Sequence, residues 1–296
     1  MAVTTAPSAP VRLDGATTAL IAFTVIAWAS AFPAIRAGLV DYGPLELGAA
    51  RFAVAALPAA IYLLVTRPKI PARGELWRFA YGGIFFVAAY TLLLNIGELT
   101  VTAGAASFII NVAPIMAAIL AMIFLHERLS LRAWLGTALS FAGIGLIAFG
   151  EGEGLELNLG AILILAAAFC AASATIVQKP LFARHHPLAV SAWNMVLGAL
   201  CLAPGLPSAL VQSTEASPAG LFSAVYLGVV PSLLAYGTWT MVLARMPASR
   251  AINFMFAVPP TATLMGFLAL GEIPTPLGIL GGLLALGGVV LVNLRR

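Results

Sequence analysis

Long apolar runs separated by short polar breaks organise this sequence. A helix needs about 20 apolar residues to cross the hydrocarbon core of a bilayer, and ten runs of about that length fit the chain. We therefore predict ten membrane-spanning helices. They cover residues 17–39, 45–66, 77–98, 102–125, 131–149, 158–181, 188–210, 219–243, 248–270 and 275–294. Several breaks contain proline, whose fixed φ angle and missing N–H favour the end of a helix.

The pattern of these runs contains an internal repeat. The stretch at 103–150 recurs near the C-terminus: a shift of 146 residues places Pro114 on Pro260, and a shift of 145 places Glu127 on Glu272. In both copies an apolar helix with a proline ends at a glutamate, and a helix follows whose glycines suit close helix packing. Self-similarity at a fixed spacing indicates a fold built from duplicated units.

The repeat extends over the whole chain. A shift of 143 residues places Ser30 on Ser173 and Pro44 on Pro187, so the first five predicted helices match the last five. Because five is odd, the two halves cross the membrane in opposite senses, which gives an inverted repeat. Inverted repeats are typical of transporters, with the substrate near the midplane between the halves. The expected fold is an all-α integral membrane protein with a polar tail at 1–16 and five-helix repeats at 17–150 and 151–296.

Composition also indicates a membrane protein. Hydrophobic residues make up 61% of the chain and charged residues 9%, whereas soluble domains average roughly 45–50% and 25%. The first residues are polar and rich in Pro, Ser and Thr, so we expect a retained cytoplasmic tail and not a cleaved signal peptide. Cys170 and Cys201 lie in apolar runs, where a thiol behaves as a small hydrophobe. We expect no disulfide, metal site or cofactor.

Charge predicts the orientation. If the N-terminus is cytoplasmic, 13 of the 15 Lys and Arg residues fall on inner segments, and only Arg36 and Arg51 remain. The positive-inside rule requires this asymmetry. We expect both termini in the cytoplasm of a bacterial cell and the helices in its cytoplasmic (inner) membrane. The basic residues are dispersed over membrane-flanking loops, which argues against nucleic acid as a partner. The expected partners are the lipid bilayer and a small-molecule substrate.

Three motifs carry a resemblance to a known family: Trp28-Ala-Ser30-Ala-Phe32-Pro33, Pro44…Arg51-Phe52, and the two Pro…Glu…Gly stretches. Over residues 15–294 the sequence resembles the drug/metabolite transporter superfamily, in its ten-helix, EamA-domain branch. The resemblance implies a central cavity lined mainly by helices 1, 3, 4, 6, 8 and 9, and transport without ATP hydrolysis. Among members, the chain is most similar to exporters of amino acids and related metabolites, and its nearest match is an aromatic amino acid exporter of the YddG type.

Polar and amphipathic side chains deep inside the predicted helices are the candidates for substrate contact, because polar groups are costly in hydrocarbon and tend to face a wet cavity. Ser107, Asn111 and Pro114 share a helix face at i, i+4 and i+7. The other interpretation is that Ser, Thr and Asn bond to neighbouring helices as packing contacts. The candidate substrate-binding residues are Trp28, Ser30, Tyr90, Asn95, Ser107, Asn111, Ser173, Tyr236, Trp239 and Asn253.

Three prolines are candidate hinges: Pro33, Pro114 and Pro260. Pro33 deprives the Ala29 carbonyl of its helical donor, so the first helix should bend beside Trp28. A freed carbonyl at this depth is tolerated only against protein or a water-lined cavity. The bend therefore marks the substrate site, the hinge of a rocking motion, or a kink with a structural role.

Arg51 is the only charged residue set well within a predicted helix, about 10 Å from its outer end at 1.5 Å per residue. It could contact a substrate carboxylate, but the resemblance places helix 2 at the edge of the cavity. We therefore favour structural pairing with Glu46, Glu98 or backbone carbonyls. No Asp or Glu lies near mid-membrane. A cavity of rings, amides and hydroxyls without a fixed carboxylate predicts weak, broad transport of neutral and aromatic amino acids, driven by their own gradient.

Other functional classes fit less well. The three histidines, His126, His185 and His186, lie in predicted loops, and no base is placed to activate Ser30 or Ser173, which argues against an enzyme. A channel or a scaffold does not account for two inverted halves with prolines at matching depths. The alternative within transporters is a carrier of nucleotide sugars, organic cations or drugs, or other metabolites in the same superfamily.

Overall fold

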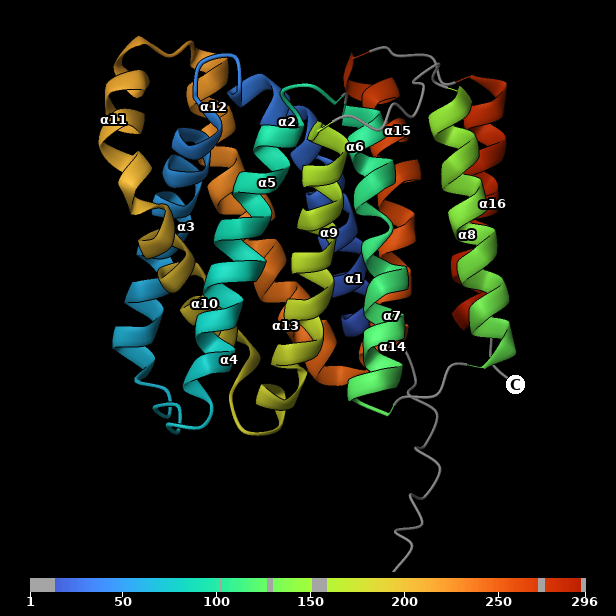
Figure 1. The fold of residues 1–296 in the computed structure, drawn as a ribbon, viewed down its shortest axis with the longest axis horizontal. Helices are drawn as coiled ribbons and strands as arrows, with labels where there is room; N and C mark the ends of the chain where they lie inside the picture. The colour runs from blue at the N-terminus through green and yellow to red at the C-terminus, as the bar shows by residue number, and fades with distance from the viewer. Residues whose placement is uncertain (1–13, 102, 127–129, 151–158, 271–274, 294–296) are drawn as a thin grey trace, which may run out of the picture.

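The structure, a computed structural model, describes residues 14–101, 103–126, 130–150, 159–270 and 275–293. Within these ranges every regular element is a helix, and none is a strand. The long helices lie side by side with their axes close to parallel (Figure 1). The all-helical fold predicted from the apolar runs is confirmed for this part of the chain. Glu127 and Glu272, which mark the predicted repeat, lie outside the described residues.

The elements follow the predicted spans along both halves. In the first half they are α1 (Gly15–Ala29), α2 (Ala31–Gly38), α3 (Pro44–Thr66), α4 (Leu76–Tyr81), η1 (Gly82–Ala89), α5 (Tyr90–Gly97), α6 (Ala103–Ile110), α7 (Ala113–Phe124) and α8 (Leu131–Gly150). In the second half they are α9 (Leu159–Gln178), η2 (Lys179–Ala183), α10 (Pro187–Leu202), η3 (Ala203–Gly205), α11 (Leu206–Glu215), α12 (Pro218–Leu227), η4 (Gly228–Leu234), α13 (Ala235–Arg245), α14 (Ala248–Asn253), η5 (Phe254–Ala257), α15 (Val258–Leu270) and α16 (Pro276–Asn293).

Six helical segments among the described residues are long and apolar enough to cross a membrane. They are Gly15–Gly38, Pro44–Thr66, Leu76–Gly97, Leu159–Ala183, Pro187–Glu215 and Pro218–Arg245. Large apolar side chains also cover the outside of the bundle: Leu57, Leu200 and Leu283 are 66%, 65% and 65% exposed. A water-facing surface rarely carries so much apolar area. The chain is a multi-pass membrane protein.

The helices break close to the three candidate hinge prolines. α1 and α2 are separated by a turn at Ser30, just before Pro33. α6 and α7 are separated by a turn just before Pro114, and the 3₁₀ segment η5 precedes Pro260 between α14 and α15. Proline removes a helical donor and crowds the preceding turn. The local sequence therefore accounts for all three interruptions.

Two π-helical segments, η1 and η4, occupy equivalent positions in the two halves. The shift of 146 residues that relates Pro114 to Pro260 also relates Gly82 to Gly228, the first residue of each segment. A tyrosine follows soon after each one: Tyr90 begins α5, and Tyr236 lies in the first turn of α13. Single π-helical turns are often found at functional sites.

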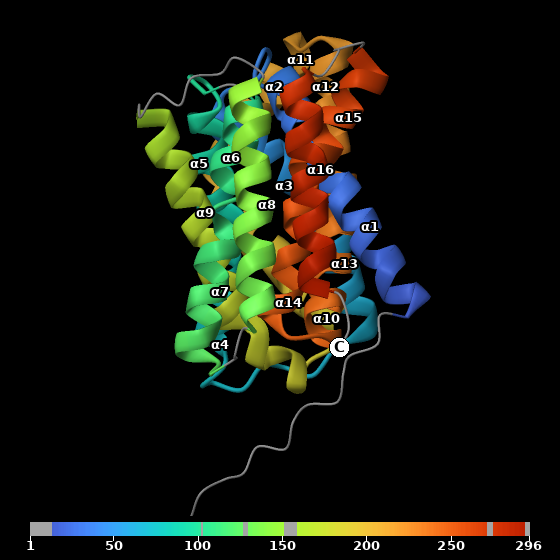
Figure 2. The ribbon, with the colours of Figure 1, turned by 90° about the vertical axis from the view of Figure 1, so that its right-hand side faces the viewer.

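α8 and α16 lie side by side at one edge of the molecule, as both views show (Figures 1 and 2). A Cβ added to Gly143 would lie 2.5 Å from the backbone nitrogen of Ala285, and one added to Gly288 would lie 2.4 Å from the carbonyl oxygen of Gly136. Side chains at these positions would force the two backbones apart. The predicted role of glycine in close helix packing is confirmed at Gly143 and Gly288 but is wrong at Gly287, where an added Cβ would meet nothing within 4 Å.

The two ends of the bundle differ in charge. Loops 67–75 and 183–186 lie at the same end (Figure 1), which we call the basic end because these loops carry Arg67, Lys69, Arg73 and Arg184. Loop 39–43 lies at the opposite end and carries an aspartate but no lysine or arginine.

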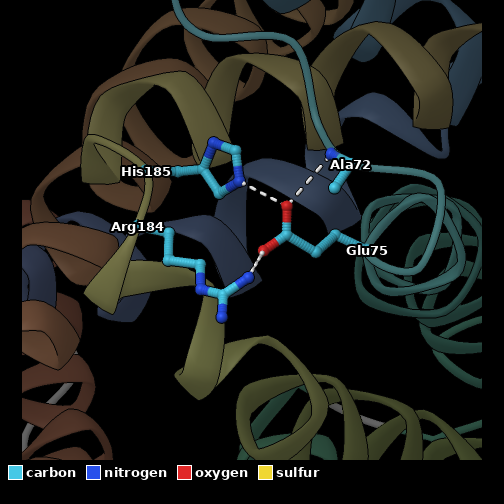
Figure 3. A network of polar contacts seen from close by, with 4 residues as sticks. All are labelled: Ala72, Glu75, Arg184 and His185. Carbon is cyan, nitrogen blue, oxygen red and sulfur yellow. Dashed lines mark hydrogen bonds and ion pairs between the residues drawn. The ribbon is translucent and has the colours of Figure 1, made fainter.

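One carboxylate at the basic end joins the two loops (Figure 3). Glu75 Oε2 lies 3.0 Å from His185 Nε2 and accepts the backbone N–H of Ala72 at 3.1 Å. Its Oε1 lies 3.3 Å from Arg184 Nη1. The His185 side chain is buried and stands edge-on to Phe79, with ring centroids 5.2 Å apart. This network ties the first half of the chain to the second.

Candidate functional site

A central cavity lies between the two halves. Its water-accessible volume is about 110 Å³, which is room for several water molecules at roughly 10–15 Å³ each. Two or three residues each from α2, α5, α7, α9 and α13 line it, together with single residues from α1 and several other elements. Its aromatic wall, as we call it, consists of Trp28, Phe32, Phe86, Tyr90, Tyr236 and Trp239.

Tyr236 stands at the centre of the aromatic wall. Its ring centroid lies 4.7 Å from that of Phe86 and 5.8 Å from that of Trp28. Trp28 in turn lies 5.5 Å from Trp239. Edge-on and tilted ring pairs at such distances contribute roughly 0.5–1.5 kcal/mol each beyond the burial of their area. The rings therefore hold one another in place and present a preformed apolar surface to the cavity.

The polar tips of two wall residues bond across the halves in a reciprocal pattern. Trp28 of the first half donates its Nε1–H to the carbonyl oxygen of Pro231 in η4, at 3.0 Å. Tyr236 of the second half donates its hydroxyl to the carbonyl oxygen of Phe86 in η1, at 3.1 Å. Buried Trp and Tyr usually find such partners. Each half thus orients one ring that belongs to the other half.

Half of the predicted site residues lie on the cavity wall: Trp28, Tyr90, Asn111, Tyr236 and Trp239. The structure brings them together from α1, α5, α13 and the turn between α6 and α7. Asn111 Nδ2 donates to the carbonyl oxygen of Ser107 at 2.7 Å, which fixes the amide at the helix break. Contact of these residues with a substrate stays a prediction.

The other predicted residues lie off the cavity wall, buried among the helices: Ser30, Asn95, Ser107, Ser173 and Asn253. The Ser30 hydroxyl lies 2.6 Å from that of Tyr226, and Ser173 accepts a hydrogen bond from the Tyr81 hydroxyl at 3.0 Å. Asn95 donates to the carbonyl oxygen of Pro44, and Asn253 accepts from Thr137. These contacts match the packing role that small polar residues often have in membrane helices.

Arg51 also lines the cavity, and it is the one described residue of α3 that does so. The residue is 3% exposed, and its Nε–H donates to the Ser232 hydroxyl at 2.6 Å. Among the described residues no carboxylate lies within 4.0 Å of the guanidinium and no backbone carbonyl accepts from it, so the expected structural pairing with Glu46, Glu98 or carbonyls is wrong. The hydrogen bond to η4 holds the side chain toward the second half. The cavity is therefore not neutral.

The candidate hinge prolines differ in their surroundings. Pro114 lines the cavity in the first turn of α7. Pro33 is exposed on the outside of α2. Pro260 faces α16, because a Cβ added to Gly282 of that helix would lie 3.4 Å from the Cβ of Pro260. Their role in a rocking motion stays a prediction.

Sequence reasoning missed several wall residues, among them Phe32, Phe86 and Thr175. Helical spacing offers a signal for two of them. Phe32 follows Trp28 by four residues and Phe86 precedes Tyr90 by four, so each shares a helix face with a predicted aromatic residue. Thr175 bonds to a carbonyl of its own helix at 2.9 Å and leaves no comparable signal.

Comparisons with known proteins agree with this architecture. The EamA-like transporter family model matches the chain twice, at residues 16–149 and 158–294. A protein of Streptantibioticus cattleyicolor named "Probable terminal-alkyne amino-acid exporter" is 37% identical to this chain. The match covers 96% of this chain and 95% of that protein. The "Uncharacterized transporter YdfC" of Bacillus subtilis is 34% identical over 90% of this chain and 88% of its own. The "Probable amino-acid metabolite efflux pump" of Escherichia coli is 27% identical over 94% of each chain.

A solved crystal structure supports the same fold. It superimposes with a TM-score of 0.74 at 17% identity, over 94% of this chain and 96% of its own. The two family matches together span nearly the whole chain and include both sides of the cavity. The protein belongs to the EamA-like transporter family, within the drug/metabolite transporter superfamily, and is a multi-pass membrane transporter.

Proposed function

We propose that this protein exports amino acids, aromatic and other neutral ones, across the inner membrane of a bacterium, with both termini in the cytoplasm. Two similar proteins are named as an amino-acid exporter and an amino-acid metabolite efflux pump, which supports cargo of this class. The observation that carries the proposal is the aromatic wall, which both halves build around one cavity.

The aromatic wall suits an amino acid in two ways. The faces of Trp28, Tyr236 and Trp239 can pack against an apolar or aromatic side chain. An aromatic face also attracts an ammonium group by roughly 0.5–2 kcal/mol. Contacts with rings tolerate varied side chains, because few polar groups are left unpaired when the substrate changes. Weak, permissive binding also allows release, which an exporter needs.

The cavity opens to each side in turn, in this proposal, as two inverted five-helix repeats rock against each other. The reciprocal ring-to-carbonyl hydrogen bonds between the halves support it. Two hydroxyl pairs also join the halves, Ser30 with Tyr226 and Ser173 with Tyr81. Inverted repeats of ten helices in total would have two arrangements of similar energy. The hinges would lie at the proline-marked helix breaks.

Transport by purified protein in liposomes tests the proposed cargo. We expect uptake of radiolabelled phenylalanine down its own gradient, competition by other neutral amino acids, and no requirement for a proton or sodium gradient. Uptake that needs an imposed ion gradient would contradict transport driven by the amino acid's own gradient. Uptake of a single amino acid only would contradict the proposed broad specificity. Uptake of a nucleotide sugar or an organic cation in place of amino acids would assign the chain to another branch of the superfamily.

A matched pair of tryptophans tests the wall itself. Trp239 lies on the aromatic wall, whereas Trp77 is 51% exposed on the outside. We expect Trp239→Ala to slow phenylalanine uptake about tenfold, because loss of one ring face removes about 1 kcal/mol or more of contact, and to slow alanine uptake less. Trp77→Ala should leave both rates unchanged. Equal effects of the two substitutions would remove the support for an aromatic substrate site.

A further inference from the structure

One charged side chain lies on the wall of the central cavity. The proposed contacts between the substrate and the aromatic rings do not involve it. It is Arg51 on α3, and every other described residue that lines the cavity is uncharged. An ionisable residue within a membrane helix is costly to retain and usually marks the path of a substrate or an ion. Its place on the wall therefore points to recognition of a charged group.

The guanidinium of Arg51 is fixed on one side and open on the other. Its Nε–H donates to Ser232 Oγ at 2.6 Å, and Ser232 in turn donates to the Leu227 carbonyl at 2.8 Å. The Phe52 ring lies 5.1 Å from Cζ. These contacts orient the plane of the group. They leave the two terminal amino groups, with four of the five N–H donors, without a hydrogen bond to any residue that the structure describes.

No acid neutralises Arg51 by contact. Glu98, one helical turn beyond the wall residue Leu94, lies farther than 4.0 Å from the Arg51 guanidinium. Both oxygens of Glu98 are buried without a hydrogen-bond partner among the described residues. Buried charges are costly unless they are paired and hydrogen-bonded. A carboxylate that entered the cavity would supply the missing partner of Arg51, in a bidentate pair if both terminal amino groups take part.

We propose that Arg51 is the anion anchor of the cavity, whose terminal amino groups bind the α-carboxylate of the transported molecule. The Phe52 ring beside the guanidinium lies 6.4 Å from that of Tyr236, so the anchor stands next to the centre of the aromatic wall. One amino acid can then place its carboxylate on Arg51 and its side chain on the rings. The inference rests on the proposed function and deepens it, because it makes a free carboxylate the feature that the transporter selects.

Binding of phenylalanine and phenylalaninol tests the anchor, since phenylalaninol carries an alcohol in place of the carboxylate. Purified protein can be titrated with either compound while the fluorescence of the wall tryptophans is followed. We expect the wild type to bind phenylalanine at least about tenfold more tightly, the ratio typical for loss of a hydrogen bond to a charged group. Arg51→Gln should lower the affinity for phenylalanine to that for phenylalaninol and leave the latter unchanged. Arg51→Lys should fall between, because it keeps the charge and loses the planar fork.

Two further variants separate the anchor from a structural role. Arg36→Gln is the matched control, since Arg36 is exposed on α2 and bonds only weakly, at 3.4 Å, to the Val101 carbonyl. It should keep the preference for phenylalanine. If Arg51 served only to balance Glu98, the double variant Arg51→Gln/Glu98→Gln would restore tight binding of phenylalanine. An anchor role predicts no such rescue in a double variant that elutes as a folded monodisperse protein.

The outcomes distinguish this inference from the proposed function. If the wild type transports phenylalanine but binds phenylalaninol equally well, or if Arg51→Gln keeps the preference, the anchor is wrong and amino-acid transport stands. If 3-phenylpropionate, which has a carboxylate and no ammonium, binds through Arg51 while no amino acid is transported, the anchor stands and the proposed cargo fails. If no compound with a carboxylate binds, both are wrong.

Discussion

At the scale of the residue, Glu75 shows how one side chain can join the two halves (Figure 3). The hydrogen bond from His185, followed by the backbone N–H of Ala72, holds the pKa of Glu75 below its ordinary value of 4.5. A lowered pKa in the native state means that the ionised carboxylate stabilises the fold. This contribution is fully present above pH 4.5 and is lost as the pH falls through the lowered value.

Thermal unfolding of purified protein checks this pH dependence. We expect the melting temperature of the wild type to be slightly higher than that of the Glu75→Gln variant at neutral pH. This difference in melting temperature should narrow below pH 4.5 and then disappear. The gap should be small because the site is partly open to water, where screening weakens charge contacts. Glu215→Gln, at an exposed acid in α11, is the control and should show no such narrowing. A gap that stays constant well into the acid range would rule out the Glu75 carboxylate as its source.

The side chains that reach the cavity were predictable from sequence only in part. Trp28 and Tyr236 each bond to one carbonyl through their polar tips, but their large rings remain to be accommodated. Their depth in the helix therefore predicted that they line the cavity. The Ser30 hydroxyl bonds to the Ala27 carbonyl three residues earlier and to the hydroxyl of Tyr226, and no local pattern encodes the second contact. Arg51 reaches the wall through a hydrogen bond to a residue 181 positions away. Contacts of that range require the fold to be known.

At the scale of the element, the apolar runs predicted where helices form, while ten membrane spans stay a prediction beside the six described segments that are long and apolar enough. α3 was expected at 45–66 and runs from Pro44 to Thr66, because length and hydropathy alone define such a helix. The π-helical shape of η1 was not predictable. η1 contains no proline, and a Cβ on Gly83 would lie 2.4 Å from Leu197 Cβ in α10. The π-helical shape of η1 therefore coincides with a close contact to α10, and the sequence of η1 itself contains no signal for it.

Two adjacent glycines in α16 provide a matched test of how α8 and α16 pack. A Cβ added to Gly288 meets backbone atoms of Gly136 and Ser140 at 2.4 and 2.6 Å, whereas one added to Gly287 meets nothing within 4 Å. We expect Gly288→Ala to destabilise the protein by about 1–3 kcal/mol through overpacking. Gly287→Ala should be neutral or stabilise it by up to ~1 kcal/mol, since alanine favours helix. Unfolding in denaturant measures both, and effects of the same sign and size would refute close packing at Gly288.

At the scale of the whole molecule, the position of the charges gives the bundle a direction. The basic end carries the arginines and lysine of loop 67–75 and Arg184 of loop 183–186, whereas loop 39–43 at the opposite end carries Asp41 alone (Figure 1). The positive-inside rule predicts that the basic end faces the cytoplasm. In the proposed orientation the network around Glu75 would lie on the cytoplasmic side, where it would join the halves at the end from which the proposed exporter loads.

Cysteine labelling tests this direction. Val40 and Ile70 are matched, since each is an apolar loop residue that is 83% exposed, and they lie at opposite ends. In a background with Cys170→Ala and Cys201→Ala, Val40→Cys should react with a membrane-impermeant maleimide in intact cells. Ile70→Cys should react only after the cells are permeabilised. The reverse result would invert the molecule and place Glu75 outside. Reaction of both in intact cells would break the link between charge and side on which the proposed orientation depends.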